Sequence, residues 1–172
     1  KSLGIRDRAI LELLYATGLR VSEINKLNVV DIDLGTCELR VLGKGMKQRS
    51  VLMGISARDA LELYLKEVRP NLECKDSYKA LFLNRYGTRL SSRSIQQKIR
   101  YYSTKAALRD GIHTHTLRHS FATHMLDGGA DLRIVQDLLG HSRPGTPQIY
   151  THVTQSKAKE VYLSAHPKAT TH

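Results

Sequence analysis

Four histidines fall within the twelve residues from His113 to His124, and they raise the question of a metal site. His115 and His119 are four residues apart, a spacing that places both on one face of a helix. A zinc-protease helix needs Glu directly after the first His, whereas Thr116 stands there. No carboxylate lies within the run, and Asp127 is the nearest one after it. Because the ligand set is incomplete, we expect no metal here.

Arginine and lysine side chains offer a second chemistry, the binding of a phosphodiester. Phosphoryl transfer gathers negative charge in its transition state, and fixed cationic donors stabilise that charge. Arginine suits the task because its planar fork bonds two phosphate oxygens at once. The 27 Lys and Arg residues exceed the 16 Asp and Glu residues, which gives a net charge of +11. Such a balance favours nucleic acid as a partner, although an anionic metabolite or an acidic protein is the alternative.

Length and composition indicate one ordinary globular domain. The chain has 172 residues, of which 41% are hydrophobic and 25% charged. No apolar stretch approaches the roughly 18 residues of a membrane span, so we expect no membrane partner. Cys37 and Cys74 form no CxxC pair and suit two free thiols in a reducing cytoplasm, although one disulfide stays open. We therefore expect a cytoplasmic protein.

Hydrophobic spacing and turn residues predict the elements that must position these side chains. The fold class they indicate is α+β, mostly helical, with a small three-stranded antiparallel sheet. The predicted helices span Ile5–Thr17, Ser22–Leu27 with Ser22 as its cap, Ser56–Arg69 ended by Pro70, Ser91–Leu108, Thr116–Leu126, Asp131–Leu139 and Ser156–Ala165. The predicted strands span Val29–Leu34, Glu38–Leu42 and Ser50–Met53.

The helix predicted over Ser91–Leu108 is the candidate for entering a DNA groove. Arg93, Gln97 and Arg100 recur on one face of it, opposite an apolar stripe. Arginine and glutamine can read base edges in the major groove in bidentate fashion. Arg85 and Arg89 precede the helix. The alternative is an ordinary solvated helix face.

Five short motifs occur in a fixed order along the chain. They are Ala16-Thr-Gly-Leu-Arg-Val-Ser-Glu23, Gly43-Lys-Gly45, His115-Thr-Leu-Arg118, Leu139-Gly-His141 and Gln148-Ile-Tyr-Thr-His152. Together, from Gly4 to about Pro167, the chain resembles the catalytic domain of the tyrosine recombinase (phage integrase) family, most closely its Xer-type site-specific recombinases.

The resemblance implies a nucleophile and its proton-transfer partners. Tyr150 matches the tyrosine that attacks the scissile phosphate to give a 3′-phosphotyrosyl link and a free 5′-hydroxyl. Lys44 matches the lysine that protonates the departing 5′-oxygen, with Lys47 as a nearby competitor. His115 matches the residue that accepts or relays the tyrosine proton. The segment Ser142–Pro147 departs from the family pattern, because it carries two prolines and a glycine where small hydroxylated residues are usual.

The resemblance also implies the groups that hold the phosphate. Arg20 and Arg118 match the two arginines that clamp the non-bridging oxygens. His141 matches a second histidine that donates to a phosphate oxygen, and Glu23 matches an acidic position that supports the pocket.

The implied function is site-specific DNA recombination by metal-free transesterification, such as the resolution of chromosome or plasmid dimers. It needs no cofactor, and its partners are a double-stranded recombination site and other protomers in a tetramer. Residues 1–172 then correspond to the C-terminal catalytic domain, without the amino-terminal core-binding domain. Residues 156–172 form a terminal helix and tail that dock on a neighbouring protomer or fold back. The alternatives are relaxation by a type IB topoisomerase-like enzyme, a non-catalytic DNA-binding module and, more distantly, a metal-dependent hydrolase.

Overall fold

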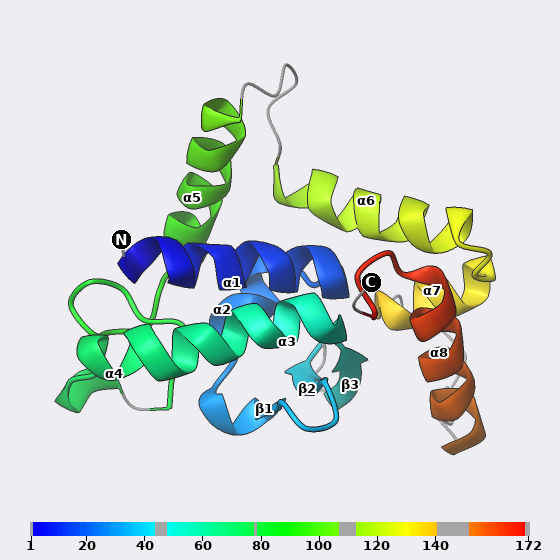
Figure 1. Cartoon of the computed structure of the whole chain (residues 1–172), viewed down its shortest axis with the longest axis horizontal. Coiled ribbons are helices and arrows are strands. Elements are labelled where there is room, and N and C mark those ends of the chain that lie inside the picture. Colours follow the sequence, from blue (N-terminus) through cyan, green and yellow to red (C-terminus); the bar gives the residue numbers. More distant parts are fainter. Residues whose placement is uncertain (1, 44–47, 78, 107–112, 141–151, 171–172) are drawn as a thin grey trace.

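The computed structural model describes residues 2–43, 48–77, 79–106, 113–140 and 152–170. Helix α1 crosses the middle of the molecule, with α3 beside it and the sheet below (Figure 1). The α-helices are α1 (Ser2–Thr17), α2 (Val21–Lys26), α3 (Gly54–Leu63), α4 (Arg69–Leu72), α5 (Ser92–Lys105), α6 (Thr114–Asp127), α7 (Leu132–Leu138) and α8 (His152–Ala165). Within the described ranges, no helix has both the length and the hydropathy needed to cross a membrane.

The three-stranded antiparallel sheet predicted from the sequence is confirmed. Strands β1 (Ile32–Asp33), β2 (Glu38–Leu42) and β3 (Gln48–Leu52) pair in the order β1-β2-β3, with Leu39 opposite Val51. Strand β1 is shorter than the predicted Val29–Leu34. Residues Val29–Asp31 instead form the 3-10 turn η1, in which the Asp31 carboxylate accepts the backbone N–H of Asn28 at 2.8 Å. A side chain thus takes the place of a ladder bond at the start of the strand.

Pro70 does not end the long amphipathic helix, contrary to the sequence prediction. The chain passes from α3 through one π-helical turn, η3 (Tyr64–Val68), directly into α4. Pro70 lies in the first turn of α4, where a missing N–H costs no hydrogen bond. The π turn lets the chain re-enter a helix that a proline would otherwise break.

Apolar side chains form two clusters that share α1 as a neighbour. The larger cluster joins α1, α2, α3, α5 and the sheet, and the smaller one joins α6, α7 and α8. Helix α1 packs against both α3 and α6. The buried Tyr162 of α8 donates its hydroxyl to the carbonyl of Ala16 at 3.0 Å. The described elements therefore form one body rather than separate modules.

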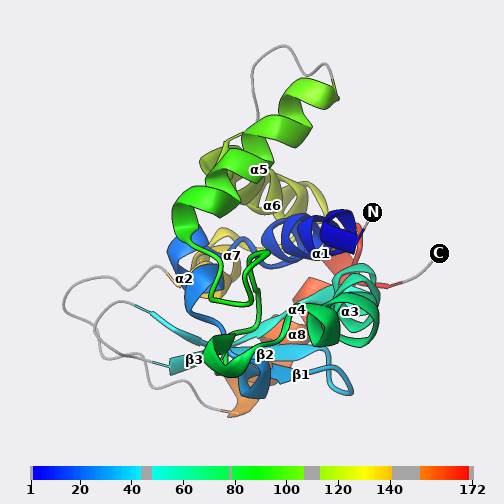
Figure 2. The same cartoon turned by 90° about the vertical axis from the view of Figure 1, so that its left-hand side faces the viewer.

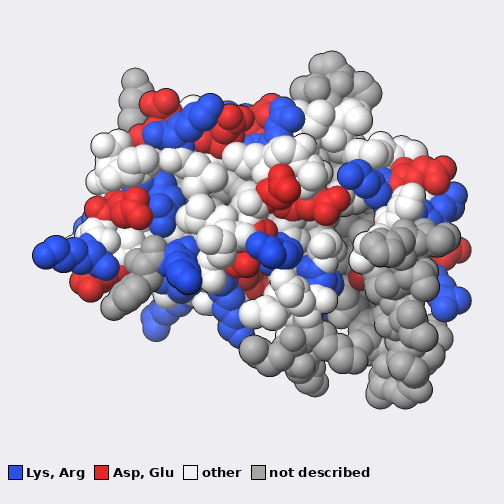
Figure 3. Space-filling view, turned by 90° about the horizontal axis from the view of Figure 1, so that it is seen from below, with Lys and Arg blue, Asp and Glu red and all other residues white. Residues whose placement is uncertain are grey.

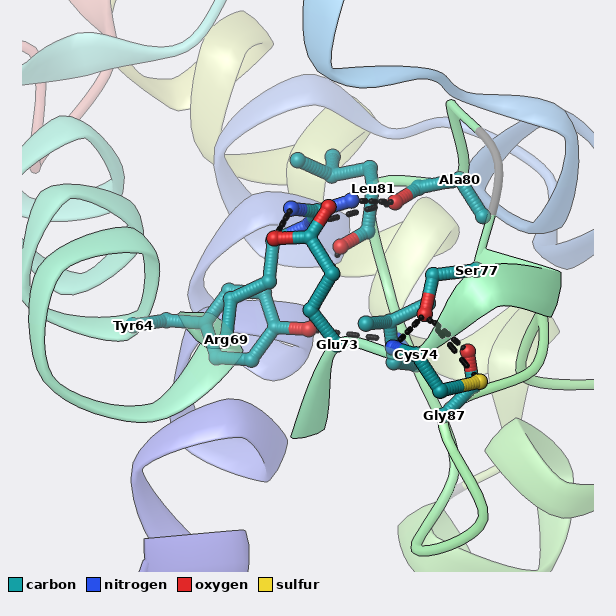
Figure 4. A network of polar contacts seen from close by, with 9 residues as sticks. Tyr64, Arg69, Glu73, Cys74, Ser77, Ala80, Leu81 and Gly87 are labelled. Carbon is teal, nitrogen blue, oxygen red and sulfur yellow. Dashed lines mark hydrogen bonds and ion pairs between the residues drawn. The ribbon is translucent and has the colours of Figure 1, made fainter. Parts of the chain in front are cut away.

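A polar network holds the irregular segment that leads from α4 to α5 (Figure 4). Arg69 donates through Nη2 to the carbonyl of Ala80 at 2.9 Å and pairs with Glu73 at 3.2 Å. The Tyr64 hydroxyl donates to the carbonyl of Leu81 and accepts from the N–H of Leu83, each at 3.1 Å. Buried backbone groups of a loop are satisfied in this way, so the loop has a fixed path. That path sets where α5 begins.

Candidate functional site

The start of α2 is built by Arg20 and Glu23. The Glu23 carboxylate accepts the backbone N–H of Arg20 at 2.9 Å, and Glu23 is only 6% exposed. Ser22, predicted to cap this helix, lies inside its first turn, because the helix already begins at Val21. The Arg20 side chain remains 49% exposed, with Nη1 3.8 Å from the Glu23 carboxylate. A buried carboxylate thus fixes the backbone of an arginine whose guanidinium is open to a ligand.

Arg118 on α6 reaches two carbonyls from different parts of the chain. Its Nη1 donates to the carbonyl of Gly18, and its Nη2 donates to that of Leu139 at 2.8 Å. Desolvation by burial, joined by the positive charge of Arg20, lowers the pKa of Arg118 to about 10. The side chain is therefore still a cation near neutral pH, although burial makes its charged form less stable than that of an exposed arginine.

Gly18 makes the contact with Arg118 possible. Its φ is +61°, in the left-handed region that favours glycine. A Cβ built there would lie 2.7 Å from side-chain atoms of both Leu139 and Phe121. The turn between α1 and α2 can therefore carry the Gly18 carbonyl to the guanidinium only if residue 18 has no side chain.

His115 lies one helical turn before Arg118 on α6 and is exposed. Other histidines of the same run have packing and surface positions. The Tyr15 hydroxyl lies 2.7 Å from Nδ1 of His124, while His119 is exposed. Among the described residues, no three His, Cys, Asp or Glu side chains lie together as a metal-binding group. Cys37 and Cys74 are free, so no disulfide joins them.

Three of the site residues implied by the resemblance lie outside the described residues. They are Lys44, His141 and Tyr150, and the competing Lys47 also lies there. Their roles remain predictions. The structure describes Arg20, Glu23, His115 and Arg118, of which the first two and Arg118 form one electrostatic cluster.

Arg49 completes this cluster and was missed by the sequence analysis. It lies on β3, and its Nη1 donates to the Glu23 carboxylate at 2.9 Å. Its side chain is 19% exposed. In the sequence it sits in a polar run beside other basic residues, which predicts a surface arginine. Arg49 also lies one residue before the strand predicted over Ser50–Met53, so the alternation of that strand did not single it out.

The side chains predicted to contact DNA lie on the outer face of α5. Arg93, Gln97 and Arg100 are all exposed, while Ile95 and Ile99 on the opposite face are buried. Figure 2 shows α5 rising from the region of α2, with which it is in contact. The structure therefore bears out the amphipathic pattern, and the contact with DNA itself remains a prediction.

Arg89, which precedes α5, is bound within the fold and not free for DNA. Its Nη1 donates to the carbonyls of Asn25 and Leu27, each at 2.8 Å. The guanidinium thus satisfies the end of α2 and is occupied within the fold. Figure 3 shows the opposite side of the molecule, seen from below, where basic and acidic side chains are interspersed and do not merge into one basic patch.

Comparison with known proteins places this arrangement in a family. Residues 1–157 match the family described as "Phage integrase family". The chain belongs to the phage integrase family. A tyrosine recombinase XerD from Staphylococcus epidermidis is 48% identical over 169 residues, which cover 98% of this chain and 57% of that relative. A tyrosine recombinase XerC from Pelotomaculum thermopropionicum is 49% identical, covering 97% and 56%. The chain thus spans a little over half the length of these integrase-family relatives.

Solved structures of the family share the fold. The crystal structure of XerA recombinase superposes with a TM-score of 0.77 at 34% identity, covering 96% of this chain and 60% of that one. XerH site-specific recombinase, bound to difH substrate in a pre-cleavage complex, gives a TM-score of 0.71 at 30% identity, covering 94% and 47%. The catalytic core of lambda integrase gives 0.62 at 22% identity over 80% and 84%, which shows the fold alone. The expected resemblance to Xer-type recombinases is confirmed.

Proposed function

We propose that this chain is the DNA-cleaving part of a Xer-type site-specific recombinase. The observation that carries the proposal is the cluster of Arg20, Arg49 and Arg118 around the single buried carboxylate of Glu23, in a phage integrase fold. Cations exceed anions there, so a bound phosphodiester relieves the repulsion among the guanidiniums. The same anion raises the pKa of Arg118 again, because it favours the charged form.

The proposed reaction is a transesterification that conserves the phosphodiester bond energy. The phenolic oxygen of Tyr150 attacks the phosphorus, and its proton passes to His115. The bond from phosphorus to the 5′-oxygen breaks, and Lys44 protonates the departing oxygen. Arg20, Arg118 and His141 hold the non-bridging oxygens, whose charge grows in the transition state. The products are a 3′-phosphotyrosyl link and a free 5′-hydroxyl. In the reverse reaction, the 5′-hydroxyl of one strand attacks the phosphotyrosyl link of a second strand and joins the two.

The proposed partners are a double-stranded recombination site and further protomers. Arg93, Gln97 and Arg100 on α5 contact the DNA in this proposal, and α8 with its tail supports the assembly of a tetramer that exchanges strands. Resolution of chromosome or plasmid dimers is the proposed task, carried out at the nucleoid. The structural similarity to XerH bound to its difH substrate supports DNA as the partner.

Covalent trapping on nicked duplexes tests the proposal. The chain first selects its site from a random-sequence duplex library. The selected site is then nicked close to the cleavage position, so that the short fragment released by cleavage diffuses away and the covalent complex is trapped. We expect a denaturant-resistant protein–DNA band in EDTA that is absent with Tyr150→Phe.

The controls separate the alternatives. DNA binding without that band would refute cleavage and leave a DNA-binding module. Relaxation of supercoiled plasmids lacking the selected site, without exchange between two sites, would favour a topoisomerase-like activity. A band that requires a divalent metal and survives in Tyr150→Phe would refute the tyrosine mechanism.

A further inference from the structure

Arg49 is bound on one side only. Nη1 donates to the Glu23 carboxylate at 2.9 Å, whereas Nε and Nη2 are buried and have no hydrogen-bond partner among the described residues. Buried guanidinium N–H groups are usually paired, because leaving them unpaired costs free energy. Within the described part of the chain, the pair with Glu23 is therefore the one hydrogen bond that holds this guanidinium, and packing must supply the rest.

The Arg49 guanidinium occupies the space beside Gly140 in which a side chain of residue 140 would begin. A Cβ built on Gly140 would lie 2.7 Å from Cζ and 2.9 Å from Nε of Arg49, and the φ of Gly140 is +70°. The residue before it, Leu139, gives its carbonyl to Arg118. Arg49 and Arg118 thus contact the same turn: Arg49 packs beside Gly140, and Arg118 donates a hydrogen bond to the carbonyl of Leu139.

The Glu23 carboxylate is the point at which the arginines compete. It lies 2.9 Å from Arg49 but 3.8 Å from Nη1 of Arg20, so Arg49 is its main cationic partner. Without Arg49, the buried carboxylate would draw the guanidinium of Arg20 toward itself, because an unpaired buried charge is costly. An arginine engaged in that way is lost to a phosphate ligand.

We propose that Arg49 is a positioning residue, which occupies Glu23 and supports the Gly140 turn so that Arg20 and Arg118 stay directed at the scissile phosphate. The inference rests on the proposed function, since it concerns the cleavage step. A lysine at position 49 would perform only one of these two tasks. It can pair with Glu23, but it has no planar group to pack beside Gly140.

The test measures DNA affinity and cleavage separately, on the nicked duplexes described above. We expect Arg49→Gln to lower the cleavage rate at saturating DNA at least about tenfold, as for misplaced catalytic groups, with DNA affinity changed less than about threefold. Arg49→Lys should recover part of the rate. Arg40→Ala, an exposed arginine on the adjacent strand β2, is the matched control and should cleave like the unaltered chain.

A second substitution distinguishes positioning from simple support of the fold. Glu23→Gln keeps an oxygen for the N–H of Arg20 but removes the negative charge. We expect the double variant Arg49→Gln, Glu23→Gln to cleave faster than Arg49→Gln alone, because the competing carboxylate is gone. Should Arg49→Gln not fold, Arg49→Lys tests the Gly140 half of the proposal alone, because lysine still pairs with Glu23, and it should cleave more slowly than the unaltered chain.

Other outcomes overturn the inference. Cleavage by Arg49→Gln within twofold of the unaltered chain would show that Arg49 is dispensable. A double variant slower than either single variant would show that the two residues act independently. If the unaltered chain itself formed no Tyr150-dependent complex, the proposed function would be wrong and the inference would fall with it.

Discussion

At the scale of single residues, His166 shows how burial fixes a protonation state. The residue is 4% exposed and its ring stacks on Tyr162, with ring centroids 5.0 Å apart. Nδ1 accepts the backbone N–H of Lys168 at 3.1 Å, and Nε2 lies 3.4 Å from the carbonyl of Tyr15. Desolvation, with smaller contributions from His124 and Lys168, lowers the pKa of His166 to about 4. The neutral ring therefore belongs to the folded state.

We expect His166 to make the fold sensitive to acid. His166 takes up a proton near pH 6.5 in the unfolded chain but only near pH 4 in the folded chain. The stability that depends on the neutral ring is therefore fully present above pH 6.5 and is lost as the pH falls from 6.5 to 4. From pH 7 to pH 4.5 the loss from this residue is about 2 kcal/mol. His166→Gln should show a flatter dependence in urea unfolding at several pH values, with the exposed His119→Gln as control. Equal acid dependence in all three proteins would contradict this.

At the scale of elements, the sequence predicted α5 correctly, but it did not predict that the helix before Pro70 continues through η3 into α4. Ser91 accepts the N–H of Ser94 at 3.1 Å as the N-cap, and Ile95 and Ile99 lie on the buried face as the spacing predicted. The prediction that Pro70 ends the helix was wrong, because a proline in the first turn of a helix does not break it. The π turn before it rests on tertiary contacts of Tyr64, which no local pattern reveals.

The candidate site divides in the same way. Arg20, Glu23 and Arg118 were identified through the family resemblance, which the five motifs carry together and in their order. Arg49 belongs to no such motif. It matters through a carboxylate 26 positions away and through the turn at Gly140, both of which depend on the folded path of the chain.

We expect the outer face of α5 to read DNA. Arg100→Ala should reduce the preference for the selected site over random DNA by about 1 to 3 kcal/mol if it contacts a base edge. Fluorescence anisotropy on both duplexes, repeated at several salt concentrations, measures the preference. Arg8→Ala, an exposed arginine on α1, is the charge-matched control. Equal weakening on both duplexes would reassign Arg100 to the phosphates, and unchanged discrimination would refute its role in base reading.

At the scale of the whole molecule, α8 belongs to the core of its own chain. Ala158, Tyr162 and Ala165 are all buried in the smaller apolar cluster, as is Ala169 after the helix. Of the two outcomes expected for this helix, the described residues adopt the fold-back onto their own chain. Docking on a neighbouring protomer remains a proposal.

Deleting the residues after Gln155 should therefore unfold the chain. The buried Tyr162 side chain alone accounts for roughly 3 to 5 kcal/mol, against a total stability of about 5 to 15 kcal/mol for a typical domain. We expect circular dichroism and urea titration to show lost or strongly reduced cooperativity, and DNA binding to disappear together with exchange. A truncated chain that kept its unfolding midpoint and lost only exchange would instead show a helix that serves docking alone.

The contact between α1 and the segment after α8 has a consequence for biosynthesis. Lys168 pairs with Glu12 at 2.8 Å, and Tyr162 and His166 cover the end of α1, so contacts span some of the longest separations in the chain. Such non-local pairings slow folding, because chain entropy is spent before the contact forms. During translation, α1 leaves the ribosome before α8, so the surface of α1 that α8 covers stays open until residue 169 has been synthesised. A nascent chain that has not reached residue 169 therefore lacks these contacts with α1, and we expect it to be less stable than the finished domain.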